Sequence, residues 1–240
     1  MGQGIRCFLD GFSLINQKGI RRFVYIPILI NFILFGLTFW WLVGQTDVIS
    51  NWVMNWLPDW LSWLTALILP FMIVGFFVFF IFLFTSFANF IAAPFHGLLA
   101  SKVEARLNPE LARQADTEFK LGHEISRTIK REWQKLMYYL PRAIGYFILF
   151  LILPVGGQII WFLFIAWMMA IQYLDFPFDN HEITFSRMRD QLWDKKSSSF
   201  GFGIIVSLFS MIPVINLFVM PVAVCGATKL WVEKMHQGIK

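Results

Sequence analysis

The feature that most constrains this chain is its set of long stretches without a single charged residue. These stretches cover residues 23–46, 60–101, 143–174 and 197–228. A transmembrane helix needs about 20 predominantly apolar residues, so each stretch is long enough to enter a bilayer. The composition agrees, because 58% of the 240 residues are hydrophobic and only 15% are charged, against roughly 25% charged in an average soluble domain. We therefore expect an all-α integral membrane protein and exclude a soluble domain and a disordered chain.

The basic residues predict the orientation. Residues 1–22 carry four Lys or Arg and residues 102–142 carry nine, whereas 47–59 carry none. The positive-inside rule places the first two segments and both termini in the cytoplasm, and 47–59 outside. Six Trp residues between 40 and 63 indicate an aromatic belt with a short helix in the outer interface. We expect no cleaved signal peptide, because Asp10 interrupts the only place where its apolar region could begin.

The last two charge-free stretches predict re-entrant hairpins. Each is 32 residues long, too long for one crossing and too short for two with a turn. Each is interrupted near its middle by helix-breaking residues, which leaves arms of roughly 10–17 residues that are too short to span. The residues expected at the turns are Pro154, Gly156, Gly157, Pro213 and Asn216. Basic blocks at both ends favour two half-penetrating hairpins; the alternative is one kinked helix per stretch.

These signals divide a single membrane domain into consecutive segments. They are a cytoplasmic amphipathic helix (1–22), a first crossing (23–46), a periplasmic interfacial segment (47–66), a second crossing (67–101), a cytoplasmic helical region (102–142), a first re-entrant hairpin (143–174), a cytoplasmic connector (175–196), a second re-entrant hairpin (197–228) and a cytoplasmic tail (229–240). We therefore expect two full transmembrane helices, two hairpins and cytoplasmic amphipathic helices.

Two amphipathic segments flank the first two crossings. The first has one apolar helical face, which we expect on the cytoplasmic membrane surface, formed by Ile5, Phe8, Leu9, Phe12 and Ile15. The second, over 118–140, has an apolar stripe of Leu121, Ile125, Ile129, Trp133 and Leu136. Its other stripe is charged and consists of Glu124, Arg127, Arg131 and Lys135. This charged stripe either lines a path or faces water.

Several motifs resemble a known family. They are Gly19–Phe23 (GIRRF), Lys130–Lys135 (KREWQK), Tyr139–Ile144 (YLPRAI), Phe176–His181 (FPFDNH) and Met211–Thr228 (MIPVINLFVMPVAVCGAT). Together they resemble the CysZ family of bacterial inner-membrane sulfate permeases over nearly the whole chain. The resemblance implies sulfate uptake for cysteine biosynthesis. It also implies two full crossings, two half-penetrating hairpins and assembly as an oligomer.

The resemblance also implies a sulfate site at the start of the first crossing, formed by Gly19, Ile20, Arg21 and Arg22. Arginine pairs with tetrahedral oxyanions through two parallel hydrogen bonds, and a helix N-terminus with free N–H groups attracts anions. The alternative is that Arg21 and Arg22 only anchor the helix at the cytoplasmic surface.

Other polar residues near the charge-free stretches are candidates for a pore or gate. They are Glu104, Arg106, Arg131, Lys135, Asp179 and His181, and Asp175 begins the same block as the last two. Ionisable groups beside a membrane path are functional candidates by default. The alternative for each is a loop salt bridge or a headgroup contact.

We expect a transporter and not an enzyme. The sequence contains no P-loop, no His-Glu-x-x-His pair and no nucleophile elbow, and its four His and two Cys have no metal-ligand spacing. We expect no cofactor, no metal and no nucleic-acid partner. The expected partners are sulfate, the lipid bilayer and further copies of the chain, the last suggested by the small residues Ala93, Gly97 and Ser101, which could equally pack within one subunit. Transport would be channel-like or proton-coupled. The alternative function is a membrane scaffold or regulator that acts through residues 102–142.

Overall fold

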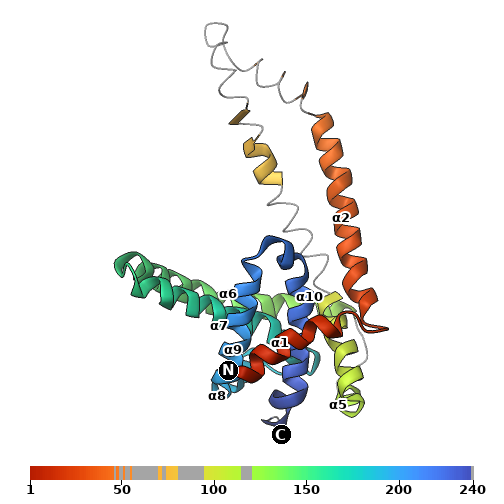
Figure 1. Ribbon diagram of the computed structural model, residues 1–240, viewed down its shortest axis with the longest axis vertical. Coiled ribbons are helices and arrows are strands. Elements are labelled where there is room, and N and C mark those ends of the chain that lie inside the picture. The colour runs from red at the N-terminus through yellow and green to blue at the C-terminus, as the bar shows by residue number, and fades with distance from the viewer. Residues whose placement is uncertain are drawn as a thin grey trace. The chain divides into compact units, whose positions relative to one another are not determined.

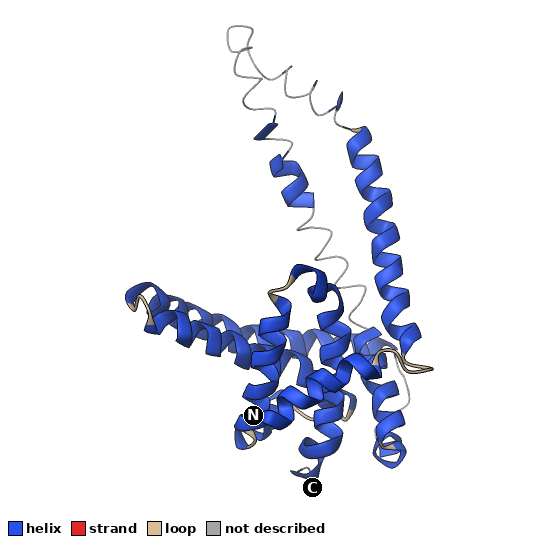
Figure 2. Ribbon diagram, in the orientation of Figure 1, coloured by secondary structure: helices blue, strands red, loops and turns tan. Residues whose placement is uncertain are grey.

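A computed structural model describes residues 1–45, 47–48, 51, 55, 70–71, 74–80, 95–114 and 121–238. Figure 2 shows these residues as helices joined by short loops, as the charge-free stretches predicted. The helices are α1 (Gly2–Leu14), α2 (Arg21–Gly44), α5 (Pro109–Gln114), α6 (Leu121–Ile152), α7 (Gly156–Asn180), α8 (Phe185–Asp194), α9 (Lys196–Ser210) and α10 (Pro213–Leu230). A π-helical turn (Trp231–Met235) and a 3₁₀ turn (His236–Gly238) follow α10.

The chain forms two compact units. The first contains Met1–Val24 and His96–Lys240, and the second contains Tyr25–Phe95. In the second unit, α2 packs on helical residues 74–80, with 5.5 Å between the ring centroids of Phe39 and Phe77. Helix α2 is the helix expected over 23–46. Most of the predicted second crossing (67–101) and of the predicted interfacial segment (47–66) lies outside the described residues.

Three helices are long and apolar enough to cross a membrane, within the described ranges. They are Arg21–Trp41, Lys130–Ile152 and Gly156–Asn180. The last two belong to α6 and α7, which are 32 and 25 residues long. Both helices are longer than the expected arms of roughly 10–17 residues, so those arm lengths are wrong, and the re-entrant arrangement of the first hairpin stays a prediction. Both helices extend beyond the charge-free stretch 143–174 into segments that contain charged residues. Several of these charged side chains, such as Arg131 and Asp175, form ion pairs within the protein.

The two hairpins of the first unit turn close to the predicted breaks (Figure 1). Helices α6 and α7 are joined by residues 153–155, which include Pro154, and Gly156 and Gly157 begin α7. Helices α9 and α10 are joined by residues 211–212, and Pro213 is the first residue of α10. Proline favours that position because its missing N–H would have no helical partner there.

Asn216 does not lie in a turn. Its backbone N–H donates to the carbonyl of Ile212 at 2.8 Å inside the first turn of α10. An asparagine within an apolar segment predicts a helix break, but α10 already begins three residues earlier, at Pro213. Pro221 also lies inside α10.

Helix α1 packs against α9 and α10. Its Cys7, Phe8 and Leu14 side chains are buried, whereas Leu9 is exposed. A Cβ on Gly226 of α10 would lie 2.7 Å from the carbonyl oxygen of Cys7, so only glycine allows this approach. The face expected on the membrane surface is thus partly covered by protein. Glycines allow the helix backbones to meet closely, which a count of apolar residues does not reveal.

Polar contacts fasten the same interface. The Lys229 ammonium lies 2.7 Å from the Asp10 carboxylate, and this hydrogen bond raises the pKa of Lys229. The Cys7 thiol donates to Glu233 at 3.6 Å. Burial, and then the Glu233 charge, raises the pKa of Cys7 to about 12. Cys7 is therefore a protonated, unreactive thiol at neutral pH.

We predict that Gly203→Ala destabilises the protein. A Cβ at this position would collide with the Ala166 carbonyl oxygen, where α9 packs on α7. Overpacking of this kind costs about 1–3 kcal/mol. The measurement is the thermal unfolding of the purified protein in detergent. The matched control is Gly145→Ala in α6, where a Cβ would meet no atom within 4 Å. Equal unfolding temperatures for the two variants would contradict the close packing of α9 on α7.

Candidate functional site

The C-terminal end of α7 carries a buried aspartate, Asp175, that meets two buried cations of α6. Asp175 and Asp179 are one helical turn apart, and so are Arg131 and Lys135 on α6. Because α6 and α7 pack side by side, this shared spacing places the two pairs opposite each other. The arrangement is a ladder of charges between two helices.

Short ion pairs connect this ladder. Arg131 Nε lies 2.7 Å from Asp175 Oδ1, and Arg131 Nη1 lies 3.3 Å from Asp179 Oδ1. Lys135 Nζ lies 3.1 Å from Asp175 Oδ2 and 2.5 Å from Glu132 Oε1. Arg131, Lys135 and Asp175 are all buried. Groups buried in this way remain charged only because each has an opposite charge in contact.

A backbone carbonyl completes the binding of Arg131. Arg131 Nη1 donates to the carbonyl oxygen of Ile183 at 2.5 Å. The preceding residue, Glu182, has φ of 55°, a left-handed conformation that costs a non-glycine residue roughly 1 kcal/mol or more. This strained turn follows α7 directly and directs the carbonyl toward the guanidinium.

The cations of the ladder are neutralised by the carboxylates of the ladder itself. Two cations, Arg131 and Lys135, face three carboxylates, those of Glu132, Asp175 and Asp179. A dianion such as sulfate could enter only by displacing a carboxylate, because the cations have no charge left uncompensated. In this arrangement the ladder locks α6 to α7 and is not an open anion cradle.

A second buried carboxylate belongs to Glu104, on helical residues 95–107. Glu104 is only 1% exposed, and its Oε1 accepts a hydrogen bond from Trp231 Nε1 at 2.7 Å. The same oxygen lies 2.7 Å from His181 Nε2, and the His181 ring lies beside the Trp231 ring. Glu104 thereby joins its own helix to the end of α7 and to the turn after α10.

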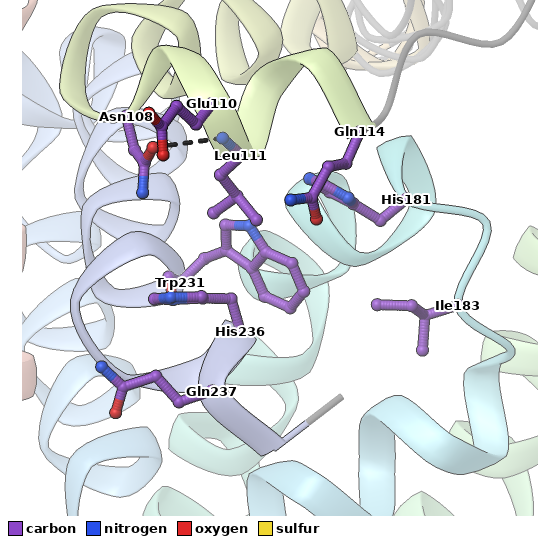
Figure 3. A pocket seen from close by; sticks show the side chains of 9 residues that line it. All are labelled: Asn108, Glu110, Leu111, Gln114, His181, Ile183, Trp231, His236 and Gln237. Atoms are coloured by element: carbon purple, nitrogen blue, oxygen red, sulfur yellow. Dashed lines mark hydrogen bonds between the residues drawn. The ribbon is translucent and has the colours of Figure 1, made fainter. Parts of the chain in front are cut away.

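A pocket of about 430 Å³ opens beside Glu104 (Figure 3). It is lined by Asn108, Glu110, Leu111, Gln114, His181, Ile183, Trp231, His236 and Gln237. In Figure 3, Trp231 lies between the His181 and His236 side chains. His181 and Trp231 line the pocket and also contact Glu104, so these two residues separate the buried carboxylate from the pocket.

The Gly19–Arg22 segment forms the turn between α1 and α2. Gly19 has φ of 92°, which favours glycine, and Ile20 is buried. Arg21 and Arg22 are exposed in the first turn of α2. The backbone N–H of Arg21 donates to the Gln17 carbonyl. The expectation of free N–H groups is therefore wrong at Arg21, and an anion here would depend mainly on the two guanidinium groups.

The structure brings most of the pore and gate candidates together. Arg131, Lys135 and Asp179 share the ladder, and Glu104 contacts His181. Arg106 is exposed and stands apart from these contacts. Sequence reasoning gave Asp175 too little weight, although its spacing from Asp179 matches that of Arg131 and Lys135. It missed Trp231, for which no local pattern exists.

The small-residue repeat has a partner within the chain. Asn180 Nδ2 donates to the Gly97 carbonyl at 3.2 Å and to Ser101 Oγ at 3.0 Å. Of the two possibilities for this repeat, packing within one subunit is therefore the one seen at Gly97 and Ser101. Ala93 lies outside the described residues.

These features define an all-helical membrane protein, with apolar helices long enough to cross a bilayer and a buried ion-pair ladder between two of them. Residues 7–221 match the family described as sulfate transporter CysZ/etoposide-induced protein 2.4. The match covers well over half of the chain, so the protein belongs to this family. The family is one of transporters, and the substrate named in its description is sulfate.

We predict that Asp175→Asn lowers the stability of the protein sharply. The substitution removes the buried carboxylate that Arg131 and Lys135 share and leaves them only the more exposed Asp179 and Glu132. Breaking a buried pair typically costs about 3–5 kcal/mol. The measurement is thermal unfolding in detergent. The matched control is Glu132→Gln, whose carboxylate is 58% exposed and also pairs with Lys135; an exposed partner contributes about 0–1 kcal/mol. A control that destabilises as much as Asp175→Asn would contradict the central role of Asp175.

Proposed function

We propose that this protein carries sulfate across the bacterial inner membrane and so supplies sulfate for cysteine biosynthesis. The observation that carries the proposal is the family match over residues 7–221. Transport is channel-like or proton-coupled, with both termini in the cytoplasm and several copies in one assembly. Sulfate is bound by the Gly19–Arg22 turn.

The geometry of the turn supports this assignment. Burial of Ile20 fixes the turn to the first unit, while the exposed Arg21 and Arg22 remain accessible to an anion. Two adjacent guanidinium groups provide the charge and the paired donors that a tetrahedral dianion needs. The site is open, and an open site suits a transporter because the substrate must also leave.

We propose further that the two hairpins are re-entrant. Arg142 is exposed, and only residues 143–152 of α6 follow it before the turn. Ten helical residues rise about 15 Å, roughly half of the hydrocarbon core. In the second hairpin, the exposed apolar side chains Leu208, Met211 and Ile212 gather at the turn. Both patterns favour a dip into the bilayer from one side.

We predict that Arg21→Ala and Arg22→Ala each reduce sulfate flux several-fold and that the double variant nearly abolishes it. Each change removes one of the two guanidinium groups that hold the anion. The measurement is radiolabelled sulfate uptake into liposomes that contain only the purified protein. Arg113→Ala is the matched control, because this arginine is exposed on α5.

The same assay separates the transporter from the scaffold alternative. No flux from the folded wild-type protein would contradict sulfate transport and favour a scaffold that acts through 102–142. Normal flux in the double variant would contradict the arginine site alone. Competing oxyanions and an imposed pH gradient then measure selectivity and proton coupling.

We predict that a cysteine in the first hairpin turn resists labelling from outside the cell. Val155→Cys is suitable because Val155 is 74% exposed, and the native Cys7 and Cys225 are buried and give little background. The reagent is a membrane-impermeant maleimide applied to intact spheroplasts. Val48→Cys, in the segment expected outside, is the positive control. Equal labelling at both positions would show that the first hairpin crosses the membrane.

A further inference from the structure

Four helices of the first unit build a patch of aromatic rings and cations around Tyr138. The Tyr138 ring packs against Phe185 of α8, and its hydroxyl accepts a hydrogen bond from Trp167 Nε1 of α7 at 3.2 Å. Trp167 in turn packs edge-on against Trp193, which is 57% exposed. The rings are therefore fixed by packing before any ligand arrives.

Three cations lie on this aromatic patch. The Arg142 guanidinium lies 3.7 Å from the centre of the Tyr138 ring, and that of Arg189 lies 6.0 Å from the same ring. The Lys196 ammonium lies 5.3 Å from the Trp193 ring. Arg189 also pairs with the exposed Asp190, which leaves a positive excess. Two arginines that converge on one ring present their hydrogen-bond donors to the same small region.

The position of the patch along the chain indicates the level of the lipid headgroups. Arg142 is the last charged residue before the charge-free stretch 143–174. Aromatic rings and arginines at such a boundary are typical of the membrane–water interface.

Helix α6 shows an unusual amphipathicity at the same level. Its charged residues Arg131 and Lys135 face the protein interior, while Trp133, Leu136, Met137 and Leu140 are exposed. The exposed apolar positions 133, 137, 140, 144, 147 and 151 recur at intervals of four and three residues and form one stripe. An apolar stripe that stays exposed while the charged face of the same helix is buried indicates a helix whose outer side contacts lipid.

We propose that the patch formed by Tyr138, Arg142, Arg189, Trp193 and Lys196 binds the phosphodiester of an anionic phospholipid, whose acyl chains contact the apolar stripe of α6. The guanidinium groups donate to the phosphate oxygens, and the aromatic rings lie at the depth of the glycerol backbone. A lipid fits this surface better than a free oxyanion does. The cations lie next to the exposed apolar stripe of α6, and acyl chains can bury that stripe whereas a free oxyanion cannot. The bound lipid fastens the base of the first hairpin to one leaflet.

The test compares lipid nanodiscs made of phosphatidylcholine alone with nanodiscs that also contain phosphatidylglycerol. We expect the phosphatidylglycerol to raise the unfolding temperature of the wild-type protein by about 4–8 °C. Arg142→Gln and Arg189→Gln should each lose about half of this increase, and the double variant nearly all of it. Arg113→Gln, at an exposed arginine of α5 with no ring contact among the described residues, should keep it.

Three outcomes would overturn the proposal. They are no increase with phosphatidylglycerol, an equal loss in Arg113→Gln, and an equal increase when inorganic phosphate is added to phosphatidylcholine nanodiscs. The last outcome would show a site for free oxyanions. Each variant is compared with itself in the two lipids, so a general loss of stability does not mimic the result. The assay contains no sulfate and reads no flux, so its failure and the failure of sulfate transport are distinguishable.

Discussion

The buried ion pair between Arg131 and Asp175 is the interaction on which the arrangement of the first unit depends. A guanidinium inside a protein must have carboxylates and carbonyls around it, and within the described residues the end of α7 and the turn after it supply them. Turning Arg131 and Lys135 inward leaves the apolar side of the same helix facing out. The ion pair therefore fixes how α6 and α7 pack and, with them, which surface of α6 is left for lipid.

The same end of α7 also organises the rest of the unit. Asn180 and His181 follow directly and bind helical residues 95–107 through Ser101 and Glu104. Trp231 reaches Glu104 from the turn after α10. Three regions distant in sequence thus converge on one helical turn. The end of α7 therefore connects the ladder, Glu104 and the pocket through direct contacts.

The two proposed anionic ligands, sulfate and an anionic phospholipid, would bind the first unit at separate sites. The Gly19–Arg22 turn offers two exposed arginines, which suits a small anion that must leave again. The Tyr138 patch offers cations on fixed rings beside an apolar stripe, which suits a resident lipid. The ladder has two cations, as many as the Gly19–Arg22 turn, but its own carboxylates already pair with them. The turn, the Tyr138 patch and the ladder therefore differ in the groups that surround their cations, and not in the number of basic residues alone.

The sequence by itself determined the class, the helical content, the turn of each hairpin to within a few residues and the residue types that carry charge near the membrane. Apolar length and helix breakers are local properties, so a linear pattern records them. Only the tertiary structure decided that Arg131 and Lys135 face inward, that Asp175 and Trp231 complete their networks, that Arg106 is left out, and that glycines bring α1 onto α10. These outcomes depend on which helix meets which, and a charged or glycine residue has the same local pattern whether it faces water or a neighbouring helix.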